Sequence, residues 1–246
     1  MLPQRWNFEL SVATGDATCT IAGNKKILHK RHIEHRRNFY LFGMEHIIHL
    51  QKDERLAEII IEPVKELRMH KNVMLTLIGS IMSQQLSTKV ADVIHGRFLA
   101  LYGGKEPSPQ QILDTPLTTL RSIGLSNAKT NYVHNVAKFC IDEKMTDKKL
   151  MAMSNDEVIE LLTQIKGVGR WTVEMLLMFT LGREDVFAVD DLGLQQSIIK
   201  LYKLRKSDKK KLREKLLRIS KKWSPYRTYA CMYLWRWKDN KPIMEK

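Results

Sequence analysis

The sequence is poor in cysteine and lacks long apolar runs. Its three cysteines, Cys19, Cys140 and Cys231, lie far apart, and none belongs to a CxxC pair. They cannot form a structural zinc site or a four-cysteine iron–sulfur cluster. We expect free thiols packed as small apolar side chains in a reducing compartment. No apolar run reaches the roughly 20 residues that span a bilayer, and the N-terminus lacks a signal-peptide pattern. The sequence therefore predicts a soluble, intracellular protein (cytoplasm and nucleoid, or nucleus) that does not bind membranes.

Common catalytic motifs are also missing. The sequence contains no Walker motif, no nucleophile elbow and no Rossmann fingerprint. We therefore expect no cofactor. The chain is nevertheless long enough to fold, because 246 residues of which 43% are hydrophobic can build one large domain or two small lobes around a shared core.

Positive charge is concentrated in two stretches. Residues 200–222 carry twelve Lys or Arg against two acids, and residues 25–37 carry six against one, in a chain of net charge +14. Such stretches suit a phosphate-binding surface, because each neutralised phosphate releases condensed counterions. A solvated helix face would look the same. His29, His32 and His35 lie among lysines and arginines, so they fit a basic surface better than a metal site.

The organisation of the chain changes near His46. Residues 1–22 alternate apolar and polar side chains around Thr14-Gly15-Asp16, which indicates a weak β-hairpin. From His46 onward the apolar spacing is helical, and no long linker interrupts it. We predict an all-α fold with a small non-helical N-terminal appendage, residues 1–45. Residues 46–75 with 190–246 would form one helical lobe, and residues 76–189 would form a central lobe that ends in a helix-hairpin-helix.

The segment 157–198 contains two helical patterns joined by a GVG turn. We expect Gly167 and Gly169 to adopt positive φ and to approach another backbone closely. The amides of Gly167, Gly169 and Trp171 would then open the second helix and form an anion site. A DNA phosphate would fit there, with or without a bridging monovalent cation; no other metal is predicted. Tight packing between two helices would also explain the glycines.

Two adjacent acids, Asp190 and Asp191, follow about twenty residues later at the start of another helix. An acid at that position ordinarily caps the helix and compensates its dipole. Because one helix start does not use both side chains as caps, we expect the second aspartate to face a cleft.

Three motifs together resemble a known family. They are IKGVGRWT (165–172), VFAVDDLGL (186–194) and LIGSIMSQQLSTKVA (77–91). The combination is similar to the helix-hairpin-helix DNA glycosylase superfamily, closest to its 3-methyladenine DNA glycosylase II branch, over residues 50–240. The resemblance implies two helical lobes around a cleft, double-stranded DNA with damaged bases as the partner, and base flipping. We expect a monomer.

The resemblance also assigns roles to residues. Asp191 falls on the catalytic carboxylate, and Asp190 would help to cap the helix. Bifunctional members carry a lysine where this chain has Trp171, so the resemblance implies a monofunctional enzyme that leaves an abasic site. Trp171 and Trp235 match positions in the base pocket. Gln85, with Gln84 beside it, matches the side chain that wedges into the duplex.

The chemistry fits these assignments. Glycosidic cleavage builds positive charge on the sugar, which a fixed carboxylate stabilises. A purine alkylated at N3 or N7 is cationic, so it leaves without an acid and is attracted by aromatic faces. Trp235 could instead be a core residue, and the two glutamines could mark a kink. Two other functions stay open: a glycosylase for deaminated or oxidised bases, and a non-catalytic DNA-binding module.

Overall fold

The computed structural model describes residues 7–10, 17–21, 24–28, 44–205 and 208–239. Residues 1–52 and 53–246 form two compact units. The first contains an antiparallel sheet in the order β1-β2-β3 (Asn7–Leu10, Ala17–Ile21, Asn24–Leu28), followed by helix α2 (Glu45–Leu50). Asn7 pairs with Thr20, which confirms the predicted hairpin, and β3 adds a third strand from the start of the basic stretch 25–37. The rest of that stretch, with its three histidines, lies outside the described residues.

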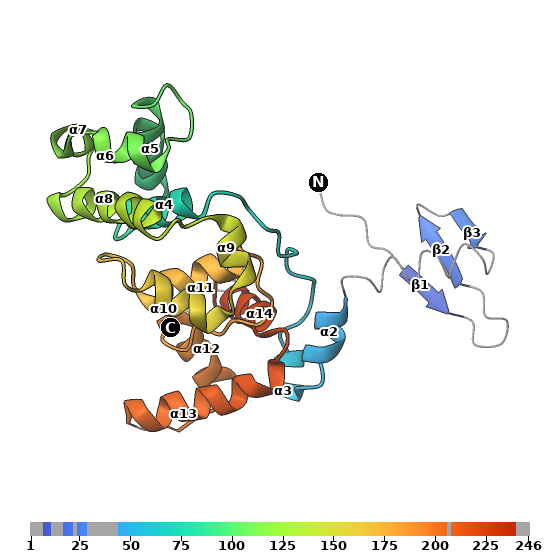
Figure 1. Cartoon of the computed structure of the whole chain (residues 1–246). Coiled ribbons are helices and arrows are strands. Elements are labelled where there is room, and N and C mark those ends of the chain that lie inside the picture. Colours follow the sequence, from blue (N-terminus) through green and yellow to red (C-terminus); the bar gives the residue numbers. More distant parts are fainter. Residues whose placement is uncertain (1–6, 11–16, 22–23, 29–43, 206–207, 240–246) are drawn as a thin grey trace, which may run out of the picture. The chain divides into compact units, whose positions relative to one another are not determined.

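The second unit is helical wherever regular structure is described (Figure 1). Its first helices are α3 (Glu54–Ala57), α4 (Val73–Ser83), α5 (Thr88–Ala100), α6 (Pro109–Asp114), α7 (Leu117–Ser122) and α8 (Asn127–Asp142). They are followed by α9 (Asp147–Ala152), α10 (Asn155–Leu162), α11 (Arg170–Phe179), α12 (Leu192–Leu201), α13 (Lys209–Ser220), the 3₁₀ turn η1 (Lys221–Trp223) and α14 (Arg227–Asp239). The all-α prediction is confirmed.

Side-chain caps fix many of the helix starts. Ser108 and Ser154 each form a complete capping box, in which the side-chain oxygens of Gln111 and Glu157 accept a hydrogen bond from the cap residue's amide. Ser126 accepts a hydrogen bond from the amide of Lys129 at the start of α8. These local signals explain why short helices form here although their isolated stability is low.

The apolar faces of the helices meet in a continuous core. Helix α4 packs against α5, α8 and α11, and α12 packs against α14. In Figure 1, α5–α8 gather on one side of α4, while α10, α11, α12 and α14 lie together. Leu77, Ile78 and Ile81 of α4 are fully buried. The division into lobes at residues 75 and 190 stays a prediction.

Two of the three cysteines belong to this core, as predicted. Cys140 and Cys231 are free and buried. Burial raises the pKa of the Cys140 thiol to about 12, and the nearby Asp147 carboxylate adds to the effect. Cys19 lies in β2, and only its backbone is described.

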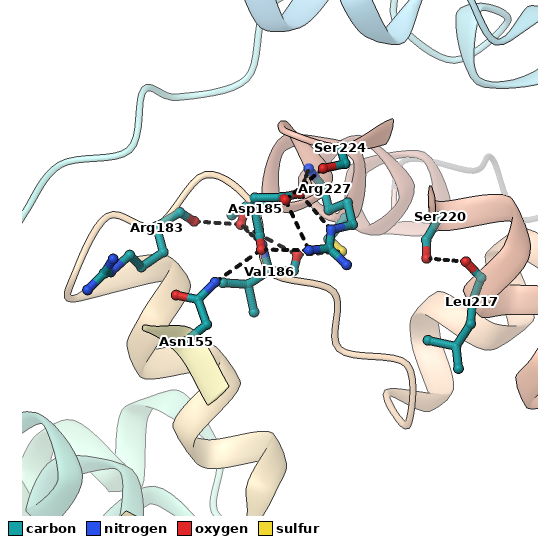
Figure 2. A network of polar contacts seen from close by, with 10 residues as sticks. Asn155, Arg183, Asp185, Val186, Leu217, Ser220, Ser224 and Arg227 are labelled. Atoms are coloured by element: carbon teal, nitrogen blue, oxygen red, sulfur yellow. Dashed lines mark hydrogen bonds and ion pairs between the residues drawn. The ribbon is translucent and has the colours of Figure 1, made fainter. Parts of the chain in front are cut away.

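A polar network fixes the loop between α11 and α12 (Figure 2). The Asp185 carboxylate accepts hydrogen bonds from Arg227 Nε at 2.6 Å and from Ser224 Oγ at 2.8 Å. Asn155 Nδ2 donates to the Asp185 carbonyl, and Arg227 begins α14. The network therefore joins α10, the loop and α14, so the loop that leads to Asp191 is anchored to the helix that carries Trp235.

In the described parts of the chain, no helix is long and apolar enough to cross a membrane.

Candidate active site

The hairpin between α10 and α11 depends on one glycine with positive φ. Gly167 has φ +106°, and a Cβ there would collide with the Tyr132 ring of α8. Positive φ at Gly167 is confirmed, but the close neighbour is a side chain rather than a backbone. The prediction of positive φ at Gly169 is wrong: its φ is −93° and its ψ 163°, because it is the N-cap of α11 and needs the extended conformation of that position.

The amides of this turn are available to a ligand. Gly169 has no side chain to cap α11, and the neighbourhood of its missing Cβ is open. Among the hydrogen bonds of the described residues, none is donated by the amides of Gly167, Gly169 or Trp171. The unpaired amides at a helix N-terminus carry partial positive charge, which is the arrangement that binds phosphate.

A buried acid holds a cation at the same turn. Glu174, one helical turn into α11, is almost fully buried, and its Oε1 accepts a hydrogen bond from Arg170 Nε at 2.9 Å. Burial raises the pKa of Glu174, against the opposing effect of Arg170. Arg170 itself is half exposed. The pair therefore keeps a half-exposed guanidinium in the first turn of α11. A buried acid in an apolar helix is a signal that the sequence offers, although its partner is not predictable from it.

Asp191 lies where three elements meet. It is the N-cap of α12, and its Oδ1 accepts from the Leu194 amide at 2.8 Å. Trp171 Nε1, from α11, donates to Asp191 Oδ2 at 2.8 Å, and Trp235 Nε1, from α14, donates to Oδ1 at 3.1 Å. The structure thus brings together the aspartate and both tryptophans that the sequence singled out.

The prediction that Asp190 helps to cap the helix is wrong, whereas the catalytic role of Asp191 stays a prediction. Asp190 does not cap the helix; its Oδ1 pairs with Arg213 Nη1 of α13 at 2.6 Å. Asp191 caps the helix and also faces the tryptophans. A carboxylate has two oxygens with about four lone-pair directions, so one side chain can do both.

The two indoles have different surroundings. Trp171 is 50 % exposed, whereas Trp235 is half-buried and its ring lies 6.1 Å from that of Phe179. Trp235 is therefore neither an ordinary core residue nor a free one. Gly193 brings α12 close to α14, because a Cβ there would lie 3.1 Å from Asp191 Oδ1 and 3.5 Å from Trp235 Cδ1. Sequence reasoning missed Gly193, since a glycine in the first turn of a helix gives no signal of what faces it.

The apolar spacing predicts that Gln84 and Gln85 lie within a helix, and this prediction is wrong. Helix α4 ends at Ser83 and α5 begins at Thr88, so both glutamines lie in the intervening turn. Gln85 is exposed and has φ +59°. The structure does not bring them into contact with Asp191.

The basic run 200–222 contains helix α13, whose lysines are mostly exposed. Arg213 connects it to Asp190, the residue before Asp191. The run therefore extends from the candidate site instead of lying on an unrelated face.

Comparison with known proteins places this geometry in a family. Residues 78–222 match the model of the HhH-GPD superfamily base excision DNA repair protein. The chain belongs to the HhH-GPD superfamily. DNA-3-methyladenine glycosylase 1 of Schizosaccharomyces pombe is 40% identical over 162 residues, which cover 65% of this chain and 70% of the relative. DNA-3-methyladenine glycosylase 2 of Escherichia coli is 21% identical over 169 residues, which cover 64% of this chain and 55% of the relative.

A solved structure agrees with the superfamily fold. The S. pombe 3-methyladenine DNA glycosylase in complex with abasic DNA superimposes with a TM-score of 0.66 at 35% identity, over 78% of this chain and 95% of that one. The predicted resemblance to the superfamily and to its 3-methyladenine DNA glycosylase II branch is confirmed. The role of each site residue stays a prediction.

Proposed function

We propose that the protein is a monofunctional DNA-3-methyladenine glycosylase that removes alkylated purines, of the 3-methyladenine and 7-methylguanine type, from double-stranded DNA. The observation that carries the proposal is the carboxylate of Asp191 bonded to two indoles, Trp171 and Trp235. The names of its relatives, which are 3-methyladenine glycosylases, support the substrate class.

In this proposal Asp191 is the catalytic residue. Cleavage of the glycosidic bond builds positive charge at the sugar, and a fixed carboxylate lowers the energy of that transition state. The cap bond and the indole bonds hold the carboxylate in one orientation. The cationic base leaves as a neutral molecule, and water completes the substitution to give an abasic site.

Trp171 and Trp235 would select the base. A flat cationic purine is attracted to an indole face by about 0.5–2 kcal/mol, and Trp171 has the exposed surface to offer one. Trp171 also occupies the position at which, by the resemblance, bifunctional members of the superfamily carry a lysine. No amine is therefore available at that position to form a Schiff base.

The remaining surfaces would hold the DNA. The amides of Gly167, Gly169 and Trp171 bind a phosphate, with or without a monovalent cation, and α13 adds long-range attraction. Flipping a nucleotide out of the duplex costs a few kcal/mol and leaves a gap in the base stack. Gln85, with Gln84 beside it, fills that gap. The enzyme is expected to be a monomer without a cofactor. Since its substrate is DNA, the predicted intracellular location also follows from this proposal.

A release assay on methylated duplex DNA tests the function. We expect free 3-methyladenine and 7-methylguanine, an intact strand until alkali is added, and no covalent adduct after borohydride reduction. Release only from deaminated or oxidised DNA would instead support a glycosylase for another lesion. Tight DNA binding without release of any base would support a non-catalytic module, and a trapped adduct would contradict the monofunctional mechanism.

A further inference from the structure

Lys129 of α8 binds the end of a neighbouring helix. Its Nζ donates hydrogen bonds to the carbonyl of Met82 at 2.9 Å and to the carbonyl of Gln84 at 2.7 Å. The last carbonyls of a helix lack partners within it and carry partial negative charge, so an ammonium group there satisfies them and stabilises the helix end. Lys129 therefore closes the C-terminus of α4 from outside.

The turn that Lys129 grips carries Gln85. Gln84 is the C-cap of α4, and the next residue has φ +59°, a conformation that costs a non-glycine residue free energy. The Leu86 amide donates to the Ser83 carbonyl at 3.1 Å, which closes the turn. The direction of the exposed Gln85 side chain is therefore set by a strained turn whose preceding carbonyl is held by Lys129.

The same helix also contacts the hairpin. Tyr132 of α8 packs against Gly167, and Asn135 Nδ2 donates to the Lys166 carbonyl at 3.1 Å. Residues 129, 132 and 135 are three apart and thus share one side of the helix. One rigid element therefore contacts both the turn of Gln85 and the phosphate-binding hairpin.

We propose that Lys129 is a positioning residue that holds Gln85 at a fixed place relative to the hairpin, so that the side chain enters the duplex while the hairpin grips the backbone. The inference rests on the proposed function, in which Gln85 is the wedge. Lys129 is half-buried, and burial lowers its pKa. Its ammonium already donates to two carbonyls, so it acts through the turn and does not bind a phosphate.

The test compares Lys129→Met, Gln85→Ala and the double variant in the full chain. Flipping is followed by fluorescence of 2-aminopurine placed beside a lesion analogue, and base release is followed in single turnover. Each single variant should reduce flipping about tenfold: Lys129→Met because it loses charge-assisted hydrogen bonds, and Gln85→Ala because it loses the wedge itself. The double variant should be no worse than Gln85→Ala, because both changes act on one step.

Two further variants serve as controls. Lys138→Met removes the same charge from the exposed part of α8, where Lys138 pairs with Asp142, and should leave flipping unchanged. Lys129→Arg keeps the charge and the donors and should restore flipping at least in part. Lys129→Gln gives a side chain that is too short to reach both carbonyls. If thermal unfolding shows that Lys129→Met does not fold, Lys129→Gln replaces it, and the same changes in flipping are expected.

The outcomes separate this inference from the proposed function. Independent, additive losses in the double variant, or normal flipping by Lys129→Met while Gln85→Ala is impaired, would overturn the positioning role and leave the wedge intact. If Lys129→Met made the negative slope of log K against log salt shallower by about one, Lys129 would contact a phosphate instead. Normal flipping by Gln85→Ala would refute the wedge assignment and this inference with it, while base release from methylated DNA would still support the enzyme activity.

Discussion

Arg213 pairs with Asp190 at 2.6 Å, whereas the next residue, Asp191, accepts hydrogen bonds from Trp171 and Trp235. Adjacent acids therefore have separate partners. Asp190 pairs with Arg213 of the basic helix α13, whereas Asp191 accepts its hydrogen bonds from the uncharged Leu194 amide and two indoles. A carboxylate whose hydrogen-bond donors are uncharged can stabilise a cationic transition state, so this arrangement favours Asp191 as the catalytic residue.

Asp191→Asn should reduce base release by at least about 10²–10³-fold, since it removes the charge and little volume. Asparagine is also a good N-cap, so α12 should remain intact. Its NH2 group cannot accept the hydrogen bond from Trp171 Nε1, but that indole is half exposed, so stability should change little. Asp191→Ala should add a loss of about 1 kcal/mol in the free energy of unfolding, because the cap is gone. Single-turnover release and urea unfolding measure the two effects.

Asp190→Asn is the matched control for this prediction. It removes one charge from a half-exposed ion pair, which is worth roughly 0–1 kcal/mol. Release should stay within a few-fold of the wild type. If Asp190→Asn abolishes release and Asp191→Asn does not, the catalytic residue is assigned to the wrong aspartate.

Charge reversal on α13 should weaken binding to any DNA sequence. Lys209→Glu, Lys210→Glu and Arg218→Glu alter exposed side chains and leave the Arg213–Asp190 pair in place. Each lost phosphate contact should make the negative slope of log K against log salt shallower by about 0.9. Fluorescence anisotropy at several salt concentrations measures it.

The control for α13 is a set of charge-reversing substitutions on other helices. The control substitutions are Lys138→Glu and Lys148→Glu. Lys138 of α8 and Lys148 of α9 are both exposed. They should weaken binding less than changes on α13 of equal number. Equal losses in both sets would mean that net charge alone matters and that α13 is only a solvated face.

The sequence predicted the elements of the site better than their contacts. Apolar spacing and turn residues are local, and they located α10, α11 and α12. Spacing failed at Gln84 and Gln85, because the apolar pattern continues across a turn; Ser87, the N-cap of α5, is the local signal of a new helix. The Lys129–Gln84 and Arg213–Asp190 contacts join residues 45 and 23 positions apart, and only tertiary packing determines them.

Acid should weaken the network around Asp185. Burial alone would raise the pKa of this carboxyl, but the hydrogen bonds and charge of Arg227, with Ser224, lower it below its ordinary value of 3.8. A carboxyl with a lowered pKa stabilises the fold above its unfolded pKa, and this contribution is lost as pH falls through the folded pKa. Asp185→Asn should therefore cost about 1–3 kcal/mol at pH 7, and the difference from the wild type should shrink below about pH 4.

Thermal unfolding followed by circular dichroism between pH 3 and 7 tests this, with pH values chosen to bracket the unfolded carboxyl pKa of about 3.9. Asp142→Asn, which removes the acid of an exposed pair with Lys138, should show a difference near zero at every pH. A constant difference for Asp185→Asn down to pH 3 would mean that the loss is one of packing and not of charge.

The two indoles beside Asp191 are expected to select the base by its charge. If Trp171 and Trp235 attract the positive charge of the lesion, truncating either should reduce release of 3-methyladenine and 7-methylguanine at least as much as release of neutral hypoxanthine. Trp171→Phe and Trp171→Leu both remove the Nε1 bond to Asp191, so that loss is common to the pair. Their difference isolates the aromatic face. Trp171→Phe should therefore be several-fold milder than Trp171→Leu for the charged bases, while for hypoxanthine the two should be closer together. Single-turnover release of each base by both variants measures this, once circular dichroism shows that the helices are retained. Equal losses for charged and neutral bases would mean that the tryptophans shape the pocket and orient Asp191 without reading charge.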